Sequence, residues 1–339
     1  MGNIIFSEGS GVTNSIFGKS QEPIKAFLEK RGEAFEAESV LPLLFNIEES
    51  SNFAEKYTTM TAMEGFKPVG ENGEYPIDGN QEGFSKYFEH DTWKNSFSLS
   101  KEIIDDAKAM DLKRQPEAFI ASYYRTRELL GAALYGTAIA GGTSVKFRGK
   151  TYPTTCADGL PVFSKVHKSA TKSSYTQSNL FADAFSVDAL SAGETKMQLF
   201  ADDDGNLLDI SPDTIVIPNL YQLKKAVFAA VGADKDPATS NNGFNYQYGR
   251  WNIVVWSYLN QYITANTAPW ILFDSKANGI YGGANWLDRE KLTVRSTLDE
   301  NTDANVWRGR ARFVAGFNDW RPLAVFGVTG GTQAVPAAD

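Results

Sequence analysis

The sequence contains little of the chemistry on which most enzymes and metal proteins depend. It has 339 residues but only one cysteine, Cys156, and two histidines, His90 and His167. A single cysteine forms no disulfide within the chain, which fits synthesis in a reducing cytoplasm. The histidines lie far apart and no HxxH or CxxC spacing occurs, so we expect no transition-metal site.

Long apolar runs are also missing. No run of roughly 18 apolar residues occurs, so no transmembrane helix and no membrane partner are expected. The start, MGNIIFSEGSG, lacks the basic and apolar regions of a signal peptide, and Phe6 stands where a myristoylation signal needs serine or threonine. The net charge of −8 argues against a stand-alone nucleic-acid binder and against attachment to an anionic membrane, although it allows a locally basic face.

Motifs for nucleotide binding and nucleophilic catalysis are absent: there is no GxSxG, GxxxxGK[ST] or GxGxxG. A Ser–His–Asp triad is not excluded, because its members meet only in the fold, but both histidines have charged or polar neighbours typical of a surface. Residues 202–205, DDDG, lack the alternate spacing and closing glutamate of a calcium loop, which predicts a solvated turn.

Carboxylate pairs and tryptophans could form a sugar-cleaving site. However, five of the seven tryptophans lie in or beside strand-like runs, which favours a core or an interface: Trp251, Trp256, Trp270, Trp307 and Trp320. We therefore predict no catalytic, cofactor-binding or metal-binding residues, no cofactor and no enzyme activity.

The longest helix-like stretch is 98–142. Pro116 divides it, because proline fits the first turn of a helix and disfavours helical geometry in the residue before it. We predict a short helix from Ser100 to about Met110 and a long one from Pro116 to about Ala140, which Gly141-Gly142 ends.

Before this stretch, the chain has little core of its own. Residues 1–19 form either a frayed terminus or an arm on a neighbouring subunit, since they carry isoleucines and phenylalanines that are costly to expose. Ser20 can cap an amphipathic helix that ends near Ala37. Residues 57–99 read as two extended arms around a Gly-rich middle, either a surface hairpin or an arm that reaches another molecule.

After the stretch 98–142, strands and helices alternate. Residues 145–153 predict a short hairpin, Ser186 caps a helix over 187–200, and 215–217 is a buried strand followed by a helix. Further strands are expected at 251–259, 269–274, 291–298, 305–317 and 321–328, and 232–248 is a polar loop.

In the strand 305–317, Arg308, Arg310 and Arg312 alternate with apolar residues, which predicts one buried and one basic face. The basic face either pairs with acids on a neighbouring strand or subunit, which the net charge favours, or contacts phosphate.

The order of these parts resembles the Hong Kong 97-type major capsid proteins of tailed bacteriophages and, among them, the Mu-like major head subunit branch. The resemblance covers roughly 40–330 and rests on four stretches: FSLSKEIIDD at 97–106, DGLPVFSKVHKS at 158–169 with NLF at 179–181, SPDTIVIPNL at 211–220 and GFNDWRPLAVFGV at 316–328.

The resemblance implies an α+β fold with four parts. These are an N-terminal arm (1–56), an extended β-hairpin loop (57–97), a peripheral domain with a long spine helix (98–184 and 286–339) and an axial α/β domain (185–285). Some family members crosslink a lysine of the loop to a neighbouring asparagine. Lys67 or Lys86 could take that role, but no motif here carries it over.

The resemblance also implies a function. Pentamers and hexamers of this chain would close into an icosahedral shell that encloses double-stranded DNA without sequence-specific binding. The shell would assemble in the bacterial host cytoplasm and become part of the virion. No scaffolding segment of about a hundred residues precedes the arm, which implies either a separate scaffolding protein or an already processed chain, and Met1 favours the former. A portal and a decoration protein are further expected partners. The alternatives are an encapsulin-like compartment with protein cargo and a carbohydrate-active enzyme.

Overall fold

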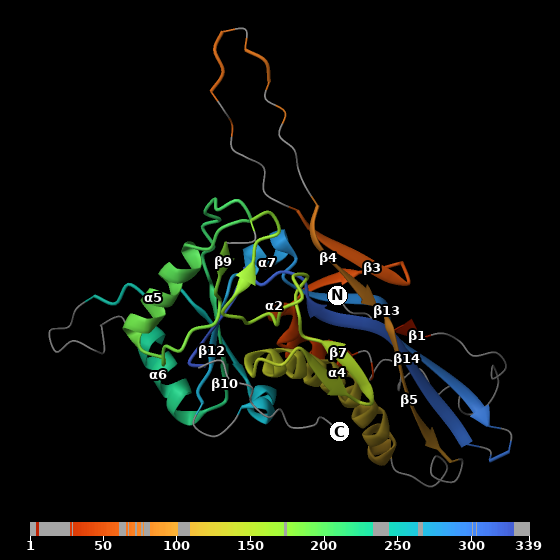
Figure 1. Cartoon of the computed structure of the whole chain (residues 1–339). Coiled ribbons are helices and arrows are strands. Elements are labelled where there is room, and N and C mark those ends of the chain that lie inside the picture. The colour runs from red at the N-terminus through yellow and green to blue at the C-terminus, as the bar shows by residue number, and fades with distance from the viewer. Residues whose placement is uncertain are drawn as a thin grey trace.

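Two sheets and one long helix form the body of the protein. The computed structural model describes residues 5–6, 28, 30–60, 66, 68–71, 73–75, 77, 82–100, 109–172, 175–232, 244–263, 267–299, 301–302 and 304–328. The large sheet lies at one end of the molecule and the smaller sheet at the other, and helix α4 runs between them (Figure 1).

The large sheet is built on two long antiparallel strands, β13 (Ala284–Asp299) and β14 (Ala304–Phe317). Strand β5 (Asp91–Leu99) pairs antiparallel with β14, while β1 (Ile5–Phe6) and β2 (Asn46–Glu49) pair parallel with β13. The strand predicted over 291–298 is part of β13, which begins earlier, at Ala284. The residues before 291 include Arg289 and Glu290, whose charges hid the strand from a reading based on hydrophobicity.

Helix α4 (Ala109–Ile139) covers one face of this sheet. Its residues Phe119 and Ile120 form a buried cluster with Leu292 and Trp307 from the strands. A Cβ at Gly309 would lie 2.4 Å from the Cζ of Phe119. Glycine at this position therefore lets the helix approach the sheet closely.

Our prediction that the long helix begins at Pro116 is wrong. Helix α4 already runs from Ala109 and continues through Pro116 without a break. A proline inside a helix costs about 3 kcal/mol, because one backbone hydrogen bond is lost and the ring crowds the preceding turn. Pro116, Phe119 and Ile120 are all buried along one stripe, and this packing offsets the cost. The predicted short helix from Ser100 lies mostly outside the described residues.

The second sheet has four strands in the order β11 (Asn252–Trp256), β10 (Thr214–Pro218), β12 (Trp270–Phe273) and β15 (Leu323–Phe326). Strands β10 and β11 are parallel and the other pairs are antiparallel. Helices α5 (Val187–Gln198) and α6 (Tyr221–Gly232) lie on one side of this sheet and α4 on the other (Figure 1). The predicted strands 215–217, 269–274 and 321–328 and the Ser186 cap are confirmed. The predicted strand 251–259 is confirmed only as far as Trp256, because residues 257–259 begin a 3-10 helix.

Short elements complete the fold. The helices are α2 (Leu41–Leu44), the 3-10 helix η1 (Ser257–Tyr262) and α7 (Ser275–Tyr281), and residues 30–37 are helical up to the predicted end. Two small hairpins are β6 (Ser144–Phe147) with β7 (Lys150–Pro153), as expected over 145–153, and β8 (His167–Lys168) with β9 (Thr176–Gln177).

A third hairpin extends from the body. It consists of β3 (Ala54–Met60) and β4 (Glu82–Glu89), which pair antiparallel. The predicted return arm therefore splits: its first half is β4, whereas its second half is β5 and belongs to the large sheet. Polar and apolar residues alternate on both sides of His90. The sequence pattern therefore does not reveal that β4 pairs with β3 whereas β5 pairs with β14.

Helix α4 connects the two sheets through its second half. The side chains of residues 130–140 are all buried, and Tyr135 donates a hydrogen bond to the carbonyl of Leu44. Glu128 accepts hydrogen bonds from the Val40 amide (2.9 Å) and from Trp256 Nε1 of β11 (3.1 Å). Helix α4 therefore packs against both the N-terminal segment around Val40 and Leu44 and the second sheet, and holds the two in a fixed relative position.

Candidate assembly surfaces

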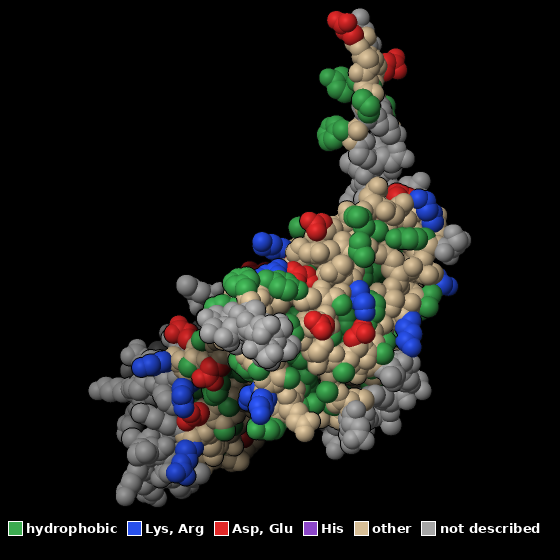
Figure 2. Space-filling view, turned by 90° about the vertical axis from the view of Figure 1, so that its left-hand side faces the viewer, with side chains coloured by type: hydrophobic (Ala, Val, Ile, Leu, Met, Phe, Trp, Pro, Cys, Tyr) green, Lys and Arg blue, Asp and Glu red, His purple; other side chains and the backbone are tan. Residues whose placement is uncertain are grey.

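The tip of the β3–β4 hairpin lies far from the body and exposes apolar side chains (Figures 1 and 2). Phe66, Tyr75 and Ile77 are 109%, 94% and 99% exposed. Glu71 and Glu74 are exposed beside them. Large apolar side chains that are almost fully exposed on one protruding segment indicate a binding surface rather than a folded core.

The base of this hairpin is firmly attached to the body. Phe88 is buried against Leu287 and Val314 of the large sheet. Tyr57 packs edge-on against Phe88 and donates a hydrogen bond to Glu48, and burial raises the pKa of Tyr57. A stiff base fixes the direction in which the hairpin projects.

Lys86 lies at this base and points into the protein. Its Nζ donates hydrogen bonds to the carbonyls of Thr155 and Phe317, the latter at 2.9 Å. Burial lowers the pKa of Lys86 to about 8. This amine is therefore engaged within its own subunit, which argues against Lys86 as a crosslinking residue. Lys67 lies outside the described residues.

A second exposed apolar surface lies on the part of the chain around α5 and α6. The exposed fractions of its large side chains range from 48% to 85%, and its members are Leu199, Leu207, Tyr221, Phe228, Phe244, Tyr246 and Tyr248. Buried polar contacts hold the loop that carries Phe244, Tyr246 and Tyr248. In this loop Gln247 Nε2 donates a hydrogen bond to Glu194 (3.2 Å), and Trp251 Nε1 donates one to Gln247 (2.6 Å). The aromatic side chains are thus presented from an ordered backbone.

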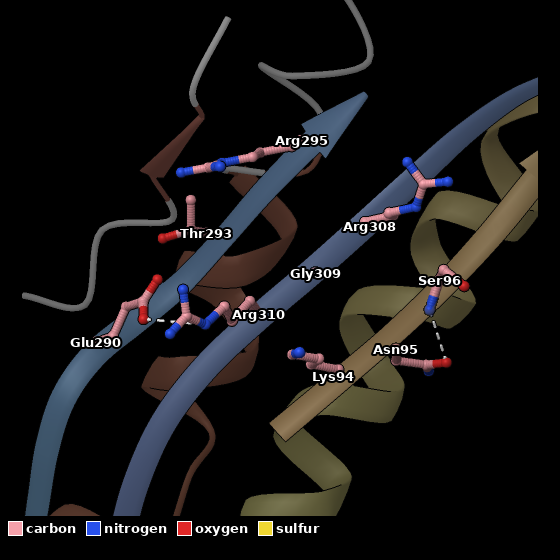
Figure 3. A pocket seen from close by; sticks show the side chains of 9 residues that line it. All are labelled: Lys94, Asn95, Ser96, Glu290, Thr293, Arg295, Arg308, Gly309 and Arg310. Atoms are coloured by element: carbon pink, nitrogen blue, oxygen red, sulfur yellow. Dashed lines mark hydrogen bonds and ion pairs between the residues drawn. The ribbon is translucent and has the colours of Figure 1, made fainter. Parts of the chain in front are cut away.

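A basic groove lies on the face of the large sheet that points away from α4 (Figure 3). Its volume is about 520 Å³ and its lining is polar apart from Gly309: Lys94, Asn95, Ser96, Glu290, Thr293, Arg295, Arg308 and Arg310. Strand β14 has the predicted alternation, with Trp307, Gly309 and Ala311 buried and Arg308 and Arg310 exposed. The basic face is therefore confirmed for Arg308 and Arg310, whereas Arg312 is half-buried and does not line the groove.

The interpretation that acids on a neighbouring strand neutralise this face holds for one residue. Arg310 Nε lies 3.4 Å from Glu290 of β13. Arg308 instead donates to the Thr297 hydroxyl. Lys94 and Arg295 were not predicted as part of this face, because the pairing of β5 and β13 with β14 is not visible in the sequence.

Our prediction that both histidines lie near the surface is wrong. His167 is 1% exposed, and its two ring nitrogens contact Asp158 (2.6 Å) and Asn179 (3.1 Å). It also stacks on Trp320, with a centroid distance of 4.5 Å. Both nitrogens are occupied within the core, so His167 serves packing and hydrogen bonding rather than proton transfer to a ligand.

His90 is also buried, and its Nε2 lies 2.9 Å from the Ser50 hydroxyl. Ser50 donates its proton to Glu55 at 2.6 Å, so the histidine must be the donor to the serine. Burial, with nearby Arg289 and Arg312, lowers the pKa of His90. This serine–histidine pair is therefore arranged in the opposite sense to a catalytic one.

The predicted solvated turn at 202–206 is a turn, but its first two carboxylates are buried. Asp202 accepts hydrogen bonds from the amides of Asp204 and Asn206, both at 2.8 Å, and Asp203 pairs with Arg321 at 3.1 Å. Across the described residues, no group of His, Cys, Asp and Glu is placed to hold a metal ion.

The five tryptophans expected in a core or an interface are all buried: Trp251, Trp256, Trp270, Trp307 and Trp320. No helix in the described parts of the chain is long and apolar enough to cross a membrane.

Together, the long helix between two sheets, the protruding hairpin and the exposed apolar side chains define a structural protein that contacts other subunits. The family model for phage capsid protein matches residues 83–326, and the chain belongs to this family. It is a major capsid protein, which forms the shell of a phage head and is a component of the virion.

Solved structures from two phages share the fold. The structure described as the capsid of Ralstonia phage GP4 is 12% identical in sequence, with a TM-score of 0.51 over 83% of this chain and 86% of that one. A chain from Mycobacterium phage Patience is 11% identical, with a TM-score of 0.50 over 98% and 94% of the two chains. No curated protein matches this chain significantly in sequence.

Proposed function

We propose that this chain forms pentamers and hexamers that close into an icosahedral shell around double-stranded DNA. The observation that carries the proposal is the hairpin, whose apolar tip has no covering within its own subunit among the described residues. A neighbouring subunit would bury that tip. Such head-to-tail contacts form rings when the rotation between subunits closes.

The four parts named above are proposed as the working units of the shell. Residues 1–56 would be the arm, 57–97 the extended loop, 98–184 with 286–339 the peripheral domain and 185–285 the axial domain. Support comes from β10, β11 and β12 of the second sheet, which lie in the proposed axial domain, and from the long strand β14 of the large sheet, which lies in the proposed peripheral domain. Strand β15 lies in the segment 286–339 but pairs with β12 of the axial segment. Strand β5 lies within the proposed loop but pairs with the peripheral sheet.

The aromatic surface around α6 supports the axial assignment. Subunits that meet around a ring axis must bury side chains there, and exposed tyrosines and phenylalanines are enriched at such interfaces. Phe244 and Tyr221 are 85% and 80% exposed in the single chain. We propose that they contact the adjacent subunit of the ring.

A closer relation to the Mu-like branch is also proposed. It is supported by the four stretches quoted above; of these, SPDTIVIPNL contains β10 and GFNDWRPLAVFGV leads from the end of β14 into β15. A separate scaffolding protein, a portal and a decoration protein would be the partners of this shell.

Assembly of the full-length chain tests the proposal. Sedimentation velocity followed by negative-stain microscopy should show rings, shells or tubes as concentration rises. A monomer at every concentration would contradict it. Nuclease-protected DNA in particles purified from infected cells would support a phage head, whereas protein cargo without DNA would indicate an encapsulin-like compartment.

A further inference from the structure

The basic groove places like charges directly opposite one another across three strands. In the register of the large sheet, Arg308 of β14 faces Arg295 of β13, and Arg310 faces Lys94 of β5. Like charges at directly opposed positions of a sheet destabilise it. Glu290 is the one acid that lines the groove, so the lining carries four positive charges and one negative. An anionic partner placed among these cations would relieve their repulsion.

The cations of the groove are largely unused within the subunit. Arg310 shares the one acid of the groove, at 3.4 Å. Lys94 and Arg295 are exposed and have no acidic partner among the residues that the structure describes. Figure 3 shows these side chains spread along three neighbouring strands rather than gathered around one point. This spread suits an extended acidic segment better than one compact anion.

The β3–β4 hairpin carries the opposite charge. Between residues 68 and 85 the sequence has four acids and neither lysine nor arginine: Glu71, Glu74, Asp78 and Glu82. Glu71 and Glu74 are exposed at the tip, and neither has a basic partner in the described parts of the chain. The tip projects away from the body, far from the large sheet of its own subunit (Figure 1). The acidic tip and the basic groove therefore meet only between different copies of the chain.

We propose that the basic groove of one subunit binds the acidic hairpin tip of a neighbouring copy, with Glu71 and Glu74 placed among its cations. The inference rests on the proposed function, in which the hairpin lies on an adjacent subunit, and it names the surface that the hairpin meets there. Complementary charges across an interface fix the register of the partners and disfavour wrong ones. The groove thus sets where each hairpin lies.

The apolar side chains of the hairpin need a separate contact. Phe66, Tyr75 and Ile77 are almost fully exposed, and no aliphatic or aromatic side chain lines the groove. Protein interfaces combine an apolar centre with a polar rim. The groove therefore supplies the charged rim of the contact, and the apolar side chains pack beside it.

The turn between β13 and β14 is the competing acidic segment of a neighbouring copy. It contains Asp299, Glu300 and Asp303. Asp299 already accepts hydrogen bonds from the Asn301 amide (3.2 Å) and from the Thr302 hydroxyl (3.0 Å). This carboxylate stabilises its own turn, whereas the two glutamates of the hairpin tip have no such role among the described residues. The hairpin is therefore the better partner for the groove.

Charge reversal on each side tests the pairing in the full-length chain. The groove variant K94E/R308E turns both opposed like-charge pairs into opposite-charge pairs, so its fold should be at least as stable as the wild type. The hairpin variant E71K/E74K changes only exposed side chains, so it tests the pairing even where the groove variant unfolds. The swapped variant carries all four changes and has the wild-type net charge of −8.

Light scattering against protein concentration measures where assembly begins. Like charges brought together across an interface are costly, so K94E/R308E and E71K/E74K should each raise this concentration at least about 10-fold. The swapped variant restores opposite charges and should assemble within about threefold of the wild type. Salt screens such contacts, so the two defects should shrink between about 0.1 M and about 1 M salt.

The matched control is K146E/K276E. It changes two exposed lysines of β6 and α7, outside the groove and the hairpin, and alters the net charge as much as K94E/R308E does. It should assemble within about threefold of the wild type.

A mixture of the two single-side variants shows whether the contact joins different copies. In a ring where K94E/R308E and E71K/E74K alternate, each reversed groove meets a reversed hairpin and each native groove meets a native hairpin. The equimolar mixture should therefore assemble at a lower total concentration than either variant alone.

Three results would overturn the proposal. The first is assembly of K94E/R308E at the wild-type concentration. The second is a swapped variant that recovers none of the loss, which would assign the groove to another acidic segment such as the turn 299–303. The third is a mixture no better than its components, which would place the contact within one subunit. Wild-type shells are scored separately by microscopy: their absence refutes the proposed function, whereas shells that form regardless of these charges refute the groove alone.

Discussion

The exposed tip of the hairpin gives the sharpest test of subunit contact. The triple substitution F66S/Y75S/I77S removes three large apolar side chains that are 94% or more exposed in the single chain. Because they contact so little of their own subunit, each change should alter the free energy of unfolding by no more than about 0.5 kcal/mol. The folded subunit should therefore be unaffected.

The effect on assembly should be large. Burying one such side chain fully is worth about 1.5–3 kcal/mol, so half-burial of all three on a neighbour contributes roughly 2–4 kcal/mol per contact. That loss corresponds to roughly a 30-fold to 1,000-fold rise in the concentration at which assembly begins. Light scattering against protein concentration measures it, and negative-stain images identify the products.

The control is F66L/Y75F/I77V, which keeps the tip apolar. It should assemble within a few-fold of the wild-type concentration. If the serine variant assembles at the same concentration as the wild type, the tip is not buried in the shell and the reasoning is refuted. If the serine variant instead loses stability as an unassembled subunit, the tip contacts its own body rather than a neighbouring subunit.

Three further predictions concern the subunit itself. R127M should lower the free energy of unfolding by about 3–5 kcal/mol in urea denaturation, because Arg127 forms a nearly buried 3.0 Å ion pair with Asp288, and adding D288N should recover part of the loss. G309A should cost about 1–3 kcal/mol by forcing Phe119 away from the sheet, and F119L should relieve it. Burial lowers the pKa of Lys86 to about 8, whereas the pKa of an unfolded lysine is near 10.4. Between these two pH values the unfolded chain binds more protons than the folded chain. The free energy of unfolding should therefore rise with pH across this window, by up to about 3 kcal/mol. Thermal unfolding of K86M should lack this rise, and an identical pH profile would contradict the burial of the amine.

Elements whose pattern is local were predictable from the sequence. The strand 215–217 lies in a short apolar run bounded by Pro218, and Ser186 has the side chain and position of an N-cap, so β10 and α5 were found correctly. The start of α4 was missed because the cost of Pro116 is local whereas the packing that offsets it comes from the sheet.

Only part of the basic face of the large sheet could be predicted from the sequence. The alternation of Arg308 and Arg310 with apolar residues indicated a basic face correctly. Lys94 and Arg295 join that face only through the register of three strands that are far apart in the chain, which no single-sequence pattern reveals. The buried positions of His90 and His167 were also hidden, because their hydrogen-bond partners inside the protein, Ser50 and Asp158, lie 40 and 9 positions away in the sequence.

We propose that copies of this chain build a closed shell in which the hairpin of each subunit lies on its neighbour. A single-particle cryo-electron microscopy reconstruction of particles assembled from the full-length chain tests it most directly. The reconstruction should have icosahedral symmetry, with Phe66, Tyr75 and Ile77 of every subunit buried against an adjacent one. Particles in which these side chains face solvent, or preparations that contain only isolated subunits, would contradict it.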